Sequence, residues 1–388
     1  MSAPDSLQLP EGLWRVMLGT TLVVLSFSLL NPVLAVRLQQ MGASSTAIGW
    51  FATLPFVAVA GLVPWVPRLF AKVGVGRAYR LGLGLELLAS LGYLFTDHYG
   101  LWCALSLLAG LGAAAAWNAT EALIAHNVPA SHRGRLTGLY QALLGAAMML
   151  GPFLPSLAGL DSRIANGVAS AGLAAGLALT LSPSVLRLQA MHEGQAHMGL
   201  WQAMRFRPAL LLAAIVGGVF EVGLGSVTTA YGAEIGLDLG RATTIAGVLG
   251  VGSFVLQYPV GWLADRWPAP RLFMVAAGLL ALSGLAFMGA TQWPALLWVC
   301  AGLWGGLGGA LYTLSMIRVA HDFADTSALA GTSAMIAGYT AGGALGPTVS
   351  GWMFDHFGVP GQGAWLTLLA LGLWFTLWRP QARSSVAP

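Results

Sequence analysis

Apolar segments of about 20 residues follow one another along nearly the whole length of this 388-residue chain. A helix of about 20 apolar residues is long enough to cross the hydrocarbon core of a bilayer. Hydrophobic residues make up 57% of the chain and charged residues only 8%, whereas a soluble domain has about 25% charged residues. The sequence therefore predicts an integral membrane protein whose function is carried out across or within a membrane.

Twelve of these segments are predicted to be transmembrane helices, because backbone groups in hydrocarbon must be hydrogen-bonded within their own span. They cover residues 13–36, 47–70, 77–96, 100–125, 135–158, 163–187, 209–233, 243–264, 270–291, 294–319, 329–353 and 361–379. The expected fold is all-α, with an N-terminal six-helix bundle at 1–187, a cytoplasmic linker at 188–207 and a C-terminal six-helix bundle at 208–388. Glycines spaced by four, at Gly338, Gly342 and Gly346 and at Gly172 and Gly176, predict close helix contacts.

The basic residues indicate how the chain is oriented in the membrane. If the N-terminus is cytoplasmic, only Arg37, Arg163 and Arg241 lie in outer segments, and the other fifteen of the 18 basic residues lie in inner ones. Cytoplasmic loops carry such an excess of Lys and Arg. Both termini are therefore predicted to face the cytoplasm, and we expect a bacterial cytoplasmic (inner) membrane. Dispersed charges in short loops do not favour nucleic-acid binding.

The two halves of the chain repeat each other. A shift of 195 residues aligns His126 with His321, the pair Gly151-Pro152 with Gly346-Pro347, and Trp117 with Tyr312. Two bundles in parallel repeat, related by a pseudo-two-fold axis, are typical of transporters that rock about a central site.

A loop motif between the eighth and ninth segments resembles a signature of the major facilitator superfamily. It reads Gly261-Trp262-Leu263-Ala264-Asp265-Arg266, with Arg271 further on and Pro268 where the signature has glycine. The resemblance covers essentially the whole chain. It implies that Gly261, Asp265, Arg266 and Arg271 form a gating loop, with Asp265 near the N-terminus of the eleventh span at Thr326, where the helix dipole favours a carboxylate. The alternative is that this loop only anchors a helix end.

Further motifs are similar to the YcaD-like branch of that superfamily. They are Leu30-Asn31-Pro32, Trp117-Asn118-Ala119-Thr120-Glu121, Arg133-Gly134-Arg135 and Gln257-Tyr258-Pro259-Val260-Gly261. Gly151-Pro152 resembles part of the Gly-Pro motif of exporters, but Pro155-Ser156 replaces its trailing glycines. The direction of transport therefore stays open.

Three acidic residues within the spans are candidates for proton coupling: Glu221, Glu121 and Glu86. Ionised carboxylates are costly in hydrocarbon and usually mark a pathway or relay. Glu221 lies near the middle of the seventh span, which the resemblance implies lines a central cavity together with spans one, four and ten. A structural hydrogen-bonding role is an equal alternative for Glu221, and a structural or gating role is favoured for Glu86.

Polar and aromatic residues in the spans are candidates for the substrate cavity. They are Asn31, Arg37, Trp117, Asn118, Gln141, Gln257, Tyr258, Tyr312, Arg318 and Tyr339. Trp117 and Glu121 share a helical face, which would suit a cationic or amphipathic ligand. Alternatively, Glu121 pairs with Arg318, and most of the others form helix–helix hydrogen bonds.

Motifs of hydrolases, metalloproteases and phosphate-binding loops are absent from the sequence, so no enzyme activity, cofactor or metal site is predicted. Cys103 and Cys300 lie within spans, which does not indicate a disulfide framework. The predicted function is proton-coupled efflux of a small apolar or cationic organic compound by alternating access, by a monomer whose partners are the substrate, protons and lipid. A metabolite importer or uniporter is the first alternative, and a transport-inactive membrane sensor or scaffold is the second.

Overall fold

The computed structural model describes residues 10–62, 65–127, 130–188, 200–264, 266–323 and 328–378, and in these ranges the chain folds into helices without strands. Two compact units form. Unit 1 comprises residues 1–43, 50–194 and 229–247, and unit 2 comprises residues 44–49, 195–228 and 248–388. The expected boundary at a 188–207 linker stays a prediction, because residues 189–199 lie outside the described ranges.

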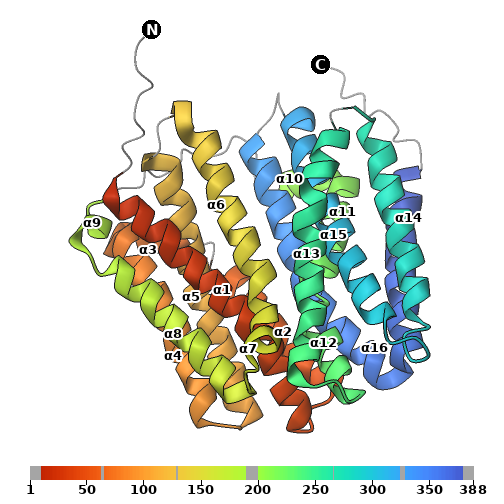
Figure 1. Cartoon of the computed structure of the whole chain (residues 1–388). Coiled ribbons are helices and arrows are strands. Elements are labelled where there is room, and N and C mark those ends of the chain that lie inside the picture. The colour runs from red at the N-terminus through yellow and green to blue at the C-terminus, as the bar shows by residue number, and fades with distance from the viewer. Residues whose placement is uncertain are drawn as a thin grey trace, which may run out of the picture. The chain divides into compact units, whose positions relative to one another are not determined.

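The first half of the chain forms α1 to α9 (Figure 1). The helices are α1 Glu11–Gln40, α2 Ser45–Leu62, α3 Val66–Val73, α4 Val75–Phe95, α5 Tyr99–Asn127, α6 Ala130–Leu150, α7 Leu154–Ala158, α8 Ser162–Thr180 and α9 Pro183–Leu186, with a 3-10 turn at Gly151–Phe153 between α6 and α7. The expected span 47–70 is wrong at its end, because α2 stops at Leu62 and α3 is a separate helix. Proline in the first turn of α3 favours a new helix start there.

The second half forms α10 to α16. These are α10 Leu200–Phe206, α11 Pro208–Val222, α12 Gly225–Glu234, α13 Leu239–Ala264, α14 Ala269–Phe287, α15 Leu296–Asp322 and α16 Ala328–Trp378. The expected span 209–233 is divided after Val222. The last two expected spans form the two limbs of α16, which bends sharply where Gly358 has φ 62° and ψ −158°. Such a positive φ is readily adopted only by glycine.

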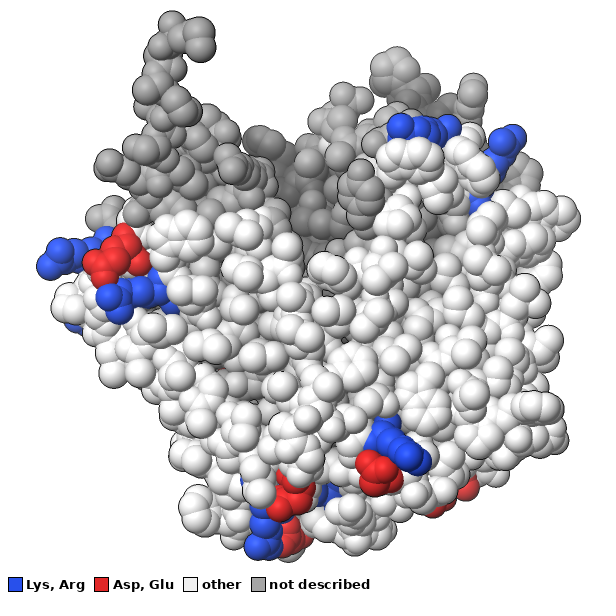
Figure 2. Space-filling view, viewed as in Figure 1, with Lys and Arg blue, Asp and Glu red and all other residues white. Residues whose placement is uncertain are grey.

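Seven described segments are both long enough and apolar enough to cross a membrane: Glu11–Gln40, Ser45–Leu62, Tyr99–Ile124, Pro208–Glu234, Leu239–Ala264, Ala269–Phe287 and Leu296–Val319. The other five expected spans also coincide with helical structure. On the face shown in Figure 2, charged side chains gather at helix ends, and the helix sides between them are uncharged. This distribution suits helices whose sides face lipid.

Aromatic rings fill the interior of both units. In unit 2, the ring centroids of Phe287 and Trp304 are 4.9 Å apart, and the indole N–H of Trp304 donates to Ser283 Oγ at 3.0 Å. In unit 1, Tyr93 and Trp102 pack edge to face at 5.2 Å, and the Trp102 indole N–H donates to the Thr96 carbonyl at 2.7 Å. Buried indoles need such acceptors, so these bonds fix the helices that contribute them.

The glycine spacing correctly predicted close helix contacts. A Cβ on Gly342 of α16 would collide with the backbone carbonyl of Ile215 in α11, and one on Gly176 of α8 would lie 3.0 Å from the Gly19 carbonyl oxygen in α1. Backbones can approach this closely only where side chains are absent.

Candidate functional site

Glu221 in α11 accepts hydrogen bonds from two other helices of unit 2. Ser253 Oγ of α13 donates to Glu221 Oε1 at 2.5 Å, and the Tyr339 hydroxyl of α16 donates to Oε2 at 2.9 Å. In the described ranges, no Lys, Arg or His nitrogen lies within ion-pair distance of this carboxylate. Hydroxyl dipoles alone therefore stabilise an ionised Glu221, without a compensating cation.

The fourth helix at this position is α15. The Tyr312 ring lies with its centroid 4.5 Å from that of Tyr339, and a Cβ on Gly309 would lie 2.8 Å from Glu221 Oε1. The absence of a side chain at Gly309 makes room for the carboxylate. Glu221, Ser253, Tyr312 and Tyr339, named here the Glu221 site, are all partly exposed.

Unit 1 carries a smaller polar group on α5. Trp117 is exposed and Glu121 is partly exposed, one helical turn apart. The Asn118 side chain donates to the Ala114 carbonyl of its own helix at 2.8 Å, so its amide is used locally. Asn31 of α1 is partly exposed and lines a hollow of roughly 40 Å³ beside Phe51 and Tyr93.

Glu86 is buried between α4 and α5. A Cβ on Gly112 of α5 would lie 2.9 Å from Glu86 Cγ, and Glu86 Oε1 has no hydrogen-bond partner among the described residues. A buried carboxylate oxygen without a partner is costly if ionised. Helix packing, rather than an open surface, surrounds this acid.

Arg37 was expected in the substrate cavity, and its contacts are structural. Its guanidinium pairs with Asp97 at 2.7 Å, donates to the Tyr93 carbonyl at 3.0 Å and lies 4.7 Å from the Trp102 ring centroid. These groups come from the end of α4, the turn after it and the start of α5. Arg37 therefore ties the end of α1 to its neighbours in unit 1.

Arg318 of α15 pairs with Asp322, one turn later on the same helix, at 2.5 Å. The Asp322 carboxylate is also 3.2 Å from Arg207 Nε, which precedes α11. This cluster joins two helix ends of unit 2. The alternative pairing of Arg318 with Glu121 stays a prediction.

The gating-loop residues are only partly described. Arg266 is exposed, donates to the Trp262 carbonyl at 3.0 Å and stacks 3.9 Å from the Trp262 ring centroid. Arg271 is exposed, and a Cβ added at Gly261 would meet no atom within 4 Å. Asp265 and Thr326 lie outside the described residues, as do the side chains of Gln141, Gln257 and Tyr258, so their expected roles stay predictions.

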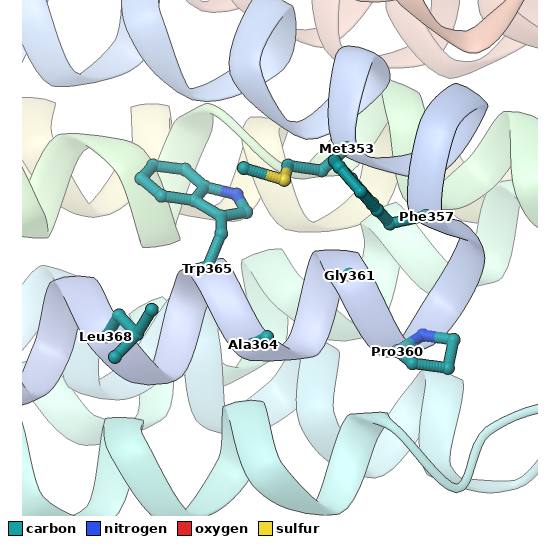
Figure 3. Close-up of a pocket in the computed structure, with 7 residues that line it drawn as sticks. All are labelled: Met353, Phe357, Pro360, Gly361, Ala364, Trp365 and Leu368. Carbon is teal, nitrogen blue, oxygen red and sulfur yellow. The ribbon is translucent and has the colours of Figure 1, made fainter.

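The kink of α16 opens a larger hollow of roughly 450 Å³ between its two limbs. Figure 3 shows Trp365 and Met353 on opposite limbs of this space. The lining is apolar throughout: Met353, Phe357, Pro360, Gly361, Ala364, Trp365 and Leu368. Such a lining holds no group that could bind an ion or a proton, and in the described ranges no cluster of His, Cys, Asp and Glu fits a metal ion either.

Sequence reasoning missed Ser253 and Gly309. A single serine in an apolar helix is common and gives no signal of its own. Gly309 belongs to the run Gly305-Gly306-Leu307-Gly308-Gly309, but such a run does not show that a carboxylate fills the space beside one of its glycines.

The profile of the Major Facilitator Superfamily matches residues 16–326 and, in a second overlapping match, residues 211–387. Among curated relatives, the chain is 22% identical over 360 residues to the uncharacterized MFS-type transporter YfkF of Bacillus subtilis (strain 168), with 91% of each protein covered. It is also 22% identical over 341 residues to the MFS-type transporter YcaD of Escherichia fergusonii, with 87% of this chain and 88% of YcaD covered.

Solved structures share the fold at low identity. The peptide transporter POT in complex with sulfate superposes with a TM-score of 0.75 at 13% identity, covering 95% of this chain and 94% of that one. A D-xylose-proton symporter gives a TM-score of 0.70 at 13% identity, covering 93% of this chain and 97% of the other.

Proposed function

Because this chain belongs to the Major Facilitator Superfamily, a family of membrane transporters, we propose that it exchanges protons for a small apolar or cationic organic compound and exports that compound. The all-α membrane fold of this superfamily and the resemblance to YcaD, both expected from the sequence, are confirmed. The finer features of coupling, substrate class and direction are the proposal.

The observation that carries the proposal is the Glu221 site. Its carboxylate accepts two hydroxyl hydrogen bonds and has no ion-pair partner among the described residues. An ionised acid in such a place is stabilised only in part, so a proton or a cationic substrate would neutralise it favourably. Binding of either one displaces the other, and this competition is the coupling step of an antiporter.

The aromatic groups support a cationic or amphipathic substrate. In unit 2, Tyr339 donates to Glu221 and its ring packs against that of Tyr312, and in unit 1 the exposed Trp117 lies one turn from Glu121. Cations bind aromatic faces with about 0.5–2 kcal/mol. In the proposal, Glu221 holds the exchanged proton in unit 2, Glu121 is a second proton candidate in unit 1, and Glu86 serves helix packing.

A proton symporter that imports its substrate is the second candidate. One solved structure of this fold is named a D-xylose-proton symporter, and the same Glu221 site could load a proton together with substrate. In both candidates we propose that the protein is a monomer in a bacterial cytoplasmic membrane, with both termini in the cytoplasm. Reporter fusions to each terminus would test the location of the termini.

The test is transport by the purified protein in proteoliposomes that enclose a pH-sensitive dye. Organic cations and sugars are added one at a time, with a pH gradient imposed in either direction. Export coupled to proton entry predicts opposite fluxes of proton and substrate, whereas symport predicts parallel fluxes. Glu221→Gln should abolish the substrate-dependent proton flux, while Glu234→Gln, which changes an exposed acid of α12, should leave it unchanged.

Full proton coupling in Glu221→Gln would contradict the site assignment. If the unsubstituted protein transports substrate at a rate that does not depend on the pH gradient, a uniporter is favoured. If it transports none of the tested compounds, the sensor or scaffold is favoured.

A further inference from the structure

Two short helices, one in each unit, carry the same arrangement of an exposed tryptophan and a stacked arginine. Trp65 directly precedes α3, and Arg68 Cζ lies 4.7 Å from its ring centroid. In α10, Arg205 Cζ lies 5.7 Å from the ring centroid of Trp201. The side chains of Trp65 and Trp201 are 55% and 68% exposed.

The opposite faces of these helices are buried. Val66 is buried and Phe70 packs on the core cluster of unit 1, while Arg68 and Lys72 are exposed. In α10, Ala203 is fully buried. Each helix is therefore held to its own unit by one face, and its arginine and tryptophan side chains remain at the protein surface.

Five arginines of the described ranges form an ion pair with a carboxylate, and the two stacked arginines are not among them. In the described ranges, neither Arg68 nor Arg205 forms an ion pair, whereas Arg241 lies 3.5 Å from Asp238 and Arg37 lies 2.7 Å from Asp97. Stacking covers one face of the guanidinium and leaves its N–H edge available. That edge matches the geometry of a phosphate group.

The expected topology assigns both pairs to the same side of the membrane. α3 follows α2, the long helix of the second expected span, and precedes α4, the helix of the third, whereas α10 lies between the sixth and seventh expected spans. In that expected topology an even number of crossings separates α3 from α10. The Trp262–Arg266 pair, at the end of the eighth expected span, shows the same stacking. Tryptophan prefers the headgroup level of a bilayer.

From these contacts we propose that α3 and α10 bind the phosphate headgroups of anionic phospholipids, with one headgroup at Trp65–Arg68 and one at Trp201–Arg205. The tryptophan ring holds the arginine at headgroup depth, and the guanidinium donates to phosphate oxygens. The proposal depends on the chain being embedded in a bilayer, and it is independent of the transported substrate.

The experiment counts lipids retained by the purified full-length protein in native mass spectrometry, after exchange from micelles that contain phosphatidylglycerol or phosphatidylcholine. We expect selective retention of phosphatidylglycerol. Arg68→Gln and Arg205→Gln should each weaken retention at one site about fivefold, which is the ratio for one basic residue at an anionic surface. Arg68→Lys and Arg205→Lys keep the positive charge but lose the planar guanidinium group, so their lipid retention should lie between that of the unsubstituted protein and that of the Gln variants.

Arg241→Gln is the matched control, because it removes an exposed arginine that is paired with Asp238. Equal losses in this control would overturn the proposal in favour of a general charge effect, and unchanged retention in the Gln variants would overturn it outright. Full competition by inorganic phosphate would show a site for free anions and overturn the lipid assignment.

Trp65→Leu and Trp201→Leu keep all charges, and reduced lipid retention in these variants supports the stacked geometry even if a Gln variant does not fold.

Discussion

The Tyr339 hydroxyl donates a 2.9 Å hydrogen bond to Glu221 Oε2 and so joins two helices whose residues are 118 positions apart in the chain. Together with the bond from Ser253, it uses one acceptor position on each carboxylate oxygen. Hydrogen bonds to a charged group stabilise it by about 1.5–3 kcal/mol. These two hydrogen bonds therefore hold the Glu221 carboxylate in place and restrict the rotamers that its side chain can adopt.

Gly309→Ala should disturb this carboxylate without changing any charge. The added methyl group would lie 2.8 Å from Glu221 Oε1, so the acid or the helix must shift. Overpacking of this kind costs about 1–3 kcal/mol, and a displaced reactive group lowers rates by about tenfold to a hundredfold. Transport in proteoliposomes measures the effect.

Gly372→Ala is the control for that substitution, because a Cβ at Gly372 meets no atom within 4 Å. Transport in Gly309→Ala equal to that of the control would mean that the geometry of Glu221 does not matter for function.

Arg37→Leu should lower the thermal stability of the protein. The substitution removes the ion pair with Asp97 and the bond to the Tyr93 carbonyl, both of which tie α1 to its neighbours. Because Asp97 is itself largely exposed, we expect a loss of about 1–3 kcal/mol, below the range for a fully buried pair. Thermal unfolding in detergent, followed by tryptophan fluorescence, measures it.

The same substitution separates two roles for Arg37. A structural role predicts reduced stability with near-normal substrate affinity in the folded fraction. Normal stability together with lost substrate binding would instead place Arg37 in the substrate cavity, as the sequence first indicated.

Acid should weaken the contact between Asp355 and the start of α2. Asp355 accepts hydrogen bonds from the backbone N–H groups of Ser45 at 2.8 Å and Thr46 at 2.7 Å. Burial raises the pKa of Asp355, but hydrogen bonds from the Thr46 side chain, the Thr46 and Ser45 backbone and the Ser44 side chain together outweigh it, so its pKa is lowered from the ordinary value. The contribution to stability is complete above the unfolded pKa of about 3.9 and is lost as pH falls through the lower folded pKa.

The expected outcome is a thermal midpoint that declines below about pH 4. Asp355→Asn should have a lower midpoint at neutral pH and a flatter acid profile than the unsubstituted protein. Identical profiles for the two proteins would show that this carboxylate does not contribute to stability.

Several features of the fold could be predicted from local sequence. Hydropathy placed twelve segments that all coincide with helices, and the glycine spacing at Gly342 predicted a close contact that the structure contains. The helix ends predicted from the sequence were less accurate than the helix positions. The apolar residues around Val66 hid the break between α2 and α3, because averaging over a window of about 20 residues smooths over a proline and two basic residues.

The sequence by itself determined that this chain is a helical membrane protein with a duplicated plan, since apolar length and charge asymmetry are sums over neighbouring residues. It also identified Glu221 as an acid that needs partners in an apolar helix. Only the tertiary structure decided that those partners are Ser253 and Tyr339, and that Arg37 binds Asp97. Such pairings depend on the rotation and crossing of helices that are distant in the chain, and no local pattern of residues encodes those angles.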